Sequence, residues 1–77
     1  MKRKVEGTIV ESVIKPIGDT EMRDGFITIR TEDDDLVKID IGSYTIFDTL
    51  DKSARVRVET DYFSTGDLYA TKVTLKV

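Results

Sequence analysis

Two segments of the chain, residues 26–31 and 36–41, carry isoleucine or valine at every second position. A period of two is typical of strands that bury one face, and the short acidic stretch between the segments predicts that they pair as a hairpin. The side chains expected to point inward are Ile27, Ile29, Val37, Ile39 and Ile41, and those expected to point outward are Phe26, Thr28, Arg30, Leu36, Lys38 and Asp40.

Three further segments have strand patterns, which makes the chain all-β in its main elements. Residues 4–15 predict a long strand in which the alternation slips after Ile9, and a slip near Gly7 favours a bent strand with a bulge. Residues 54–61 alternate cleanly. After a turn at residues 64–67, a last strand over 68–77 is expected to turn Val73, Leu75 and Val77 inward, with a phase slip near Ala70 and Thr71.

The period changes between residues 43 and 52. Gly42 ends the preceding strand, Ser43 is suited to an N-cap, and Tyr44, Phe47 and Leu50 follow at spacings of three. This spacing predicts a short helix, and a loop with a single turn is the alternative.

A length of 77 residues predicts one domain spanning 1–77, with residues 1–3 expected to fray. The sequence contains no cysteine, so disulfides and thiolate zinc sites are excluded, and a reducing, cytoplasmic location is expected. It contains no stretch of about 20 apolar residues, so no membrane-spanning helix is expected.

Nothing in the sequence predicts catalysis, a cofactor or a metal site. The chain has no histidine to activate its serines and no glycine-rich phosphate loop, so we expect no enzyme. The acidic run Glu32-Asp33-Asp34-Asp35 lacks the alternate spacing of a calcium loop, and a solvated turn is the better interpretation.

The predicted order β-β-β-α-β-β resembles that of the OB-fold. The resemblance depends on the bent strand Val5-Glu6-Gly7-Thr8-Ile9-Val10, on the fourth strand Ala54-Arg55-Val56-Arg57-Val58-Glu59, and on the closing hairpin Gly66-Asp67-Leu68-Tyr69-Ala70-Thr71-Lys72-Val73-Thr74-Leu75. It implies a five-stranded Greek-key barrel with a helix at one end. An SH3-like barrel is the rival fold.

The same resemblance implies a ligand lying across the outer face of the second and third strands. The loops beside that face would be residues 15–24 and 63–67. An aromatic ring flanked by cations fits single-stranded DNA or RNA, because a base stacks on the ring while the cations meet phosphates. The candidate binding residues are Phe26, Thr28, Arg30, Lys38, Lys15, Arg23, Tyr62 and Phe63.

Two observations favour other interpretations of these residues. The formal net charge is −3, whereas nucleic-acid binders usually have a basic surface. Phe26 and Leu36 could pack together as an apolar cross-strand patch, which would suit a protein-interaction or self-associating module. Arg55 and Arg57 form a local positive stripe that is expected to pair with acidic neighbours such as Glu59, Asp61 or Asp40.

Overall fold

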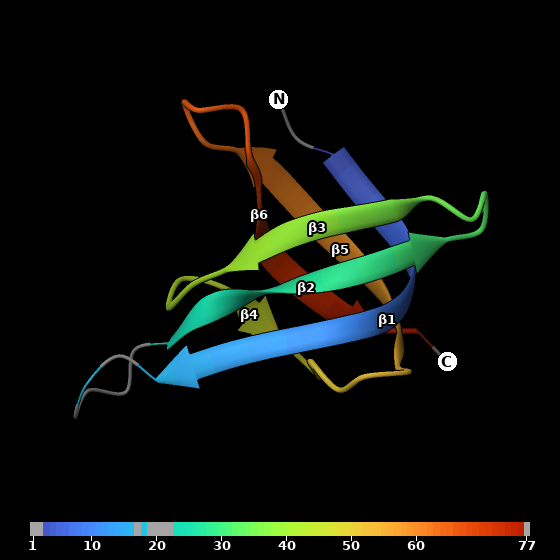
Figure 1. Cartoon of the computed structure of the whole chain (residues 1–77), viewed down its shortest axis with the longest axis horizontal. Helices are drawn as coiled ribbons and strands as arrows, with labels where there is room; N and C mark the ends of the chain where they lie inside the picture. Colours follow the sequence, from blue (N-terminus) through green and yellow to red (C-terminus); the bar gives the residue numbers. More distant parts are fainter. Residues whose placement is uncertain (1–2, 17, 19–22, 77) are drawn as a thin grey trace.

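The computed structural model of the chain contains five long strands and one short strand (Figure 1). It describes residues 3–16, 18 and 23–76. For Pro16 and Arg23 it describes only the backbone. Of the residues expected to fray, Arg3 therefore begins a strand, and residues 1–2 lie outside the described part. The strands are β1 (Arg3–Pro16), β2 (Arg23–Thr31), β3 (Leu36–Ile41), β4 (Ile46–Phe47), β5 (Arg55–Tyr62) and β6 (Leu68–Leu75).

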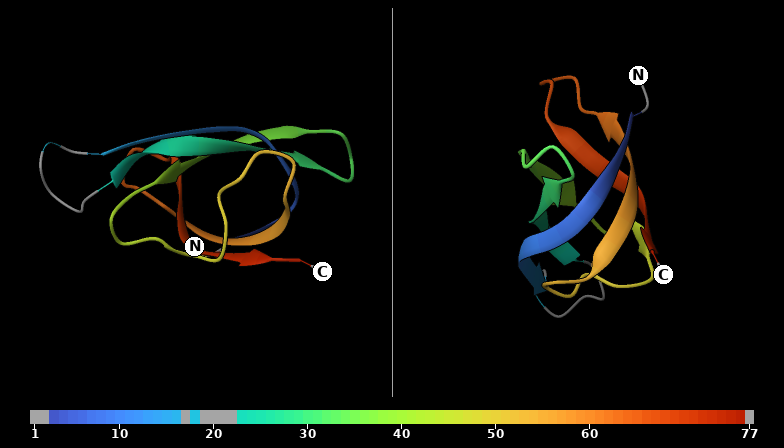
Figure 2. Two further views of the ribbon diagram at one scale, coloured as in Figure 1. Left: turned by 90° about the horizontal axis from the view of Figure 1, so that it is seen from below. Right: turned by 90° about the vertical axis from the view of Figure 1, so that its right-hand side faces the viewer.

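The long strands close into a barrel. β1, β2 and β3 pair in sequence order, β5 returns to pair with β1, and β6 pairs with β5. A parallel contact between Asp40 of β3 and Tyr69 of β6 completes the ring, and Figure 2 shows the strands curving around a common interior. The result is a small all-β barrel that is compatible with an OB-like fold.

The predicted bend in β1 is confirmed and explains how one strand serves two layers. The strand curves sharply in Figure 1. Its first half pairs with β5, its second half pairs with β2, and the register with β2 shifts between Ile9 and Glu11. Gly7 lies at the crossing, opposite both Thr31 and Val56. A Cβ atom at Gly7 would fall on the carbonyl oxygen of Arg30, so only glycine lets the strands approach this closely.

The core confirms the alternation. Each long strand contributes two fully buried apolar side chains: Val5 and Ile9, Ile27 and Ile29, Ile39 and Ile41, Val56 and Val58, and Ala70 and Val73. The slip expected near Ala70 is present, because the β5–β6 register shifts between Glu59 and Thr60. Leu75, expected inside, lies beyond the last residue of β6 that pairs with β4 and is 46% exposed. Val77 lies outside the described residues.

The predicted helix over residues 43–52 is wrong. Residues 43–44 form a turn, Ile46–Phe47 is the short strand β4 running parallel to β6, and irregular backbone follows. The backbone of this segment forms a hydrogen bond to β6 rather than within a helix, since Asp48 N–H donates to the Val73 carbonyl. Thr45 is buried, and its hydroxyl donates to the Ala70 carbonyl at 2.7 Å. These bonds to β6 outweigh the helical spacing in a segment that contains three β-branched residues, Thr45, Ile46 and Thr49.

Candidate nucleic-acid interface

The outer face of β2 and β3, which we call the β2–β3 face, carries Phe26, Thr28 and Arg30 opposite Asp40, Lys38 and Leu36 respectively. The Lys38 ammonium lies diagonally over the Phe26 ring, 4.6 Å from its centroid. At this distance the cation is attracted by the ring quadrupole. A base could stack on the half-buried ring once Lys38 moves aside, and the ammonium would then be placed to meet a phosphate of the same ligand.

The register separates Phe26 from Leu36. Leu36 lies opposite Arg30 rather than Phe26, and it is 63% exposed. The two side chains are therefore not cross-strand partners, and the apolar patch considered from the sequence does not form in that way.

Arg30 is paired locally with the β2–β3 turn. Its Nε lies 3.6 Å from the Asp34 carboxylate, and both side chains are largely exposed. Exposed pairs of this kind contribute little to stability, so a phosphate could replace Asp34 at little cost. The remaining acidic residues of the turn are exposed, and the structure places no group of three or more acidic side chains suited to a metal ion among the residues it describes.

Acidic side chains also lie on and beside the β2–β3 face. Asp40 is the cross-strand partner of Phe26, Glu11 of β1 pairs with Thr28, and Asp24 pairs with Lys15. Lys15 itself is exposed at the end of β1. The side chain of Arg23, another candidate, lies outside the described residues. The β2–β3 face is thus mixed in charge rather than basic.

Phe63 belongs to a group of rings that the sequence analysis did not predict. Its ring centroid lies 4.5 Å from that of Tyr69, which meets Tyr44 edge-on at 5.4 Å. We call Tyr44, Phe63 and Tyr69 the aromatic cluster. Tyr62, the other candidate of this region, is 38% exposed at the end of β5.

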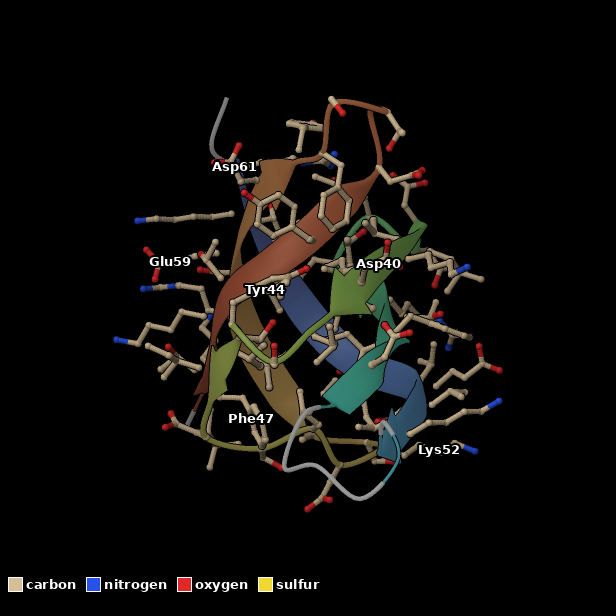
Figure 3. All side chains as sticks on the ribbon, turned by 90° about the vertical axis from the view of Figure 1, so that its left-hand side faces the viewer. Asp40, Tyr44, Phe47, Lys52, Glu59 and Asp61 are labelled. Carbon is tan, nitrogen blue, oxygen red and sulfur yellow. The ribbon has the colours of Figure 1, made fainter. Side chains whose placement is uncertain are left out.

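The aromatic cluster lies next to the β2–β3 face. Asp40 pairs with Phe26 on one side and with Tyr69 on the other, so a single row crosses β2, β3 and β6 from ring to carboxylate to ring. Tyr44 and Asp40 are labelled in Figure 3, which views the barrel from the side where these strands meet. A shallow groove of about 160 Å³ lies there, lined by Lys38, Asp40, Asp67 and Leu68.

Acidic side chains lie close enough to the aromatic cluster to affect the titration of Tyr44. The pKa of Tyr44 is raised above its usual value of 10, first by partial burial and then by Asp40, Tyr69 and Asp24. The phenol therefore stays protonated at neutral pH and can donate a hydrogen bond. Tyr69 has the same parity as the buried Val73 and points outward because of the slip near Ala70, so that slip could have identified it. Tyr44 was hidden by the incorrect helix.

The positive stripe lies on the part of the barrel formed by β1 and β5. Arg57 pairs with Glu6 of β1 at 2.6 Å, not with the acidic residues proposed from the sequence, and Lys76 binds the other oxygen of the same carboxylate at 2.8 Å. These partners come from strands far apart in the sequence. Hydrogen bonds from Lys76 and then from Arg57 hold the pKa of Glu6 below its usual value of 4.5.

The lowered pKa of Glu6 predicts an acid-sensitive contribution to stability. A carboxylate with a depressed pKa in the folded state stabilises the fold above pH 4.5, and this contribution is lost as the pH falls through the folded pKa. In urea unfolding between pH 3 and pH 7, a Glu6→Gln variant should therefore be less stable than wild type near neutrality and should converge with it in acid. Glu32→Gln, in the exposed turn, is the control; a neutral-pH loss as large in this variant would contradict the assignment.

The structure describes no helix long and apolar enough to span a membrane, within residues 3–16, 18 and 23–76. The chain matches no protein-family model, and neither a curated protein nor a solved structure is significantly similar to it.

Proposed function

We propose that this chain is a non-catalytic OB-type module that binds single-stranded nucleic acid on the β2–β3 face. The observation that carries the proposal is the row Phe26–Asp40–Tyr69, with an aromatic ring at each end and Lys38 over the first ring. Modules that bind single strands combine aromatic side chains, on which bases stack, with cations that follow the backbone. The aromatic cluster supplies the second stacking surface that Phe26 alone lacks.

The connectivity supports the OB-type assignment over an SH3-like barrel. Setting aside the two-residue β4, the fourth long strand, β5, returns by a long connection to lie beside β1, giving the spatial order β5-β1-β2-β3. This is the order of a Greek key, and a five-stranded Greek-key barrel describes the OB-fold. In that fold the outer face of the second and third strands carries the ligand.

Within the row, Asp40 would contact bases rather than phosphates. Its carboxylate can accept hydrogen bonds from the amino groups on base edges, which unstacked bases of a single strand expose. Phosphates would meet Lys38, Arg30 and Lys15, which are exposed on or beside the β2–β3 face. The proposal therefore places bases along the row toward β6 and phosphates at Lys38, Arg30 and Lys15.

A Phe26→Ala variant should weaken the binding of a short mixed-sequence single strand by about 1–3 kcal/mol, which is roughly 5- to 150-fold in Kd. Fluorescence anisotropy with labelled ssDNA and ssRNA at fixed low salt measures this. Ile46→Ala is the control, because Ile46 is an apolar residue, 68% exposed, that lies on β4. Equal affinities for the wild type and the Phe26→Ala variant, with the fold intact, would remove Phe26 from the site.

The second candidate function is a protein-interaction or self-assembly module. It is favoured by the exposure of several large apolar side chains: Leu36 at 63%, Tyr44 at 50%, Ile46 at 68% and Leu75 at 46%. If neither oligonucleotide binds, sedimentation velocity over a concentration series distinguishes a self-associating chain from a monomer that needs another partner.

A further inference from the structure

Two adjoining hollows lie on the outer surface of β1, β5 and β6. One, of about 340 Å³, is lined by residues that include Lys4, Arg57, Lys72 and Lys76, and the other, of about 460 Å³, by Arg3 and Lys4 among others. They share Lys4 and Glu59. We call this continuous depression the basic trough.

Strand pairing places the basic side chains side by side. Lys4 of β1, Glu59 of β5 and Lys72 of β6 form one row across the three strands, and Glu6, Arg57 and Thr74 form the next. Alternate residues of a strand point to the same face and are about 6.7 Å apart. The trough therefore holds a two-dimensional array of cations drawn from both ends of the sequence.

Basic side chains outnumber acidic ones in the trough, although the chain as a whole has a net charge of −3. Glu6 neutralises part of Arg57 and Lys76. Within the described part of the chain, neither Lys4 nor Lys72 has a carboxylate at ion-pair distance. Glu59 lies between these two lysines in the row but beyond ion-pair distance, so both ammonium groups remain available to a ligand.

The side of the barrel that carries the trough differs from the one that carries the aromatic cluster. Figure 3 shows Glu59 on one side, among nitrogen-ended side chains, and Asp40 on the other. The hollows contain hydroxyls, including those of Thr71 and Thr74, but no aromatic ring on which a base could stack. A surface with cations and hydroxyls but no aromatic ring is suited to contacting a chain of phosphates and does not distinguish one base from another.

We propose that the basic trough binds the phosphodiester backbone of nucleic acid, as a second contact that is independent of sequence. This inference rests on the proposed function, since it assumes the same class of ligand, but it uses a different side of the barrel. Each phosphate neutralised by a cation releases counterions, so the trough would add to the salt dependence of binding.

The test compares Lys4→Gln and Lys72→Gln with Lys52→Gln, a matched control whose exposed lysine lies in the β4–β5 connection (Figure 3). For a mixed-sequence single strand, the slope of log Kobs against log salt should fall in magnitude by about 0.7 for each trough variant and by none for the control. Sensitivity of the slope to the nucleic-acid base sequence would contradict a contact made through the backbone.

Phe26→Ala in the same titrations separates the two proposals. If the trough variants keep the wild-type slope and Phe26→Ala loses affinity, the trough inference fails and the β2–β3 face stands. If the trough variants lower the slope and Phe26→Ala has no effect, the trough stands and the β2–β3 assignment fails. Binding of inorganic tripolyphosphate without binding of either oligonucleotide would overturn both.

Discussion

A Gly7→Ala variant is expected to lose about 3 kcal/mol or more of its unfolding free energy, because one added methyl group has no space. The new Cβ would fall on the Arg30 carbonyl oxygen and lie 2.8 Å from a methyl carbon of Ile29. The strand cannot shift to relieve this contact, since Gly7 is paired with β2 on one side and with β5 on the other. The substitution would therefore separate the two layers where β1 crosses between them.

Urea denaturation of the variant measures this loss, and Gly66→Ala is the matched control. Gly66 lies in the β5–β6 turn with a φ of 94°, and a Cβ there would meet nothing within 4 Å. Only its left-handed backbone is penalised, at about 1–2 kcal/mol. If Gly7→Ala cost no more than this control, the close approach of β1 to Arg30 would not exist.

The second large effect is expected at the centre of the barrel. Ile39 has no exposed surface and lies opposite Ile27, which is equally buried. An Ile39→Ala variant should lose about 2–5 kcal/mol, from lost burial and from the cavity left behind. Because the unfolding free energy of small domains is only about 5–15 kcal/mol, this single change would remove a large fraction of it.

Leu36→Ala provides the comparison for Ile39, on the same strand. Leu36 is 63% exposed, so its truncation should change the unfolding free energy by no more than about 0.5 kcal/mol. Thermal or chemical unfolding of both variants gives the difference. Similar losses for the two would mean that the alternation along β3 does not separate an inside from an outside.

Most of the barrel was predictable from the sequence, because apolar residues at every second position within one short segment are enough to identify a strand with one buried face. The bounds of β3, the buried isoleucines of β2 and the bulge after Ile9 all followed from it. The structure of residues 43–52 was not predictable in this way. The spacing of apolar side chains that predicted a helix also arises when Phe47 and Leu50 pack against the core from an irregular segment. The conformation of this segment is determined by hydrogen bonds from Thr45 and Asp48 to β6, which join residues 25 apart in the chain.

The candidate sites divide in the same way. The outward side chains of β2 and β3 could be identified from one hairpin. The aromatic cluster needs Tyr44 to lie beside β6, and the basic trough needs β5 to lie between β1 and β6. A sequence shows which side chains point outward from each strand, but not which strands become neighbours when the sheet closes.

The pairing of β1 with β5 also orders events during synthesis. The hairpin of β2 and β3 joins neighbouring residues and can form as soon as it leaves the ribosome, whereas Glu6 and Arg57 are separated by 51 residues. Until β5 emerges, the first half of β1 is a strand with an open edge, which invites pairing with other nascent chains. Arg3, Lys4 and Glu6 place charge along that edge, and charges on an exposed edge generally oppose such pairing. Arg3 and Lys4, which line the finished trough, would therefore also disfavour misassembly of the unfinished chain.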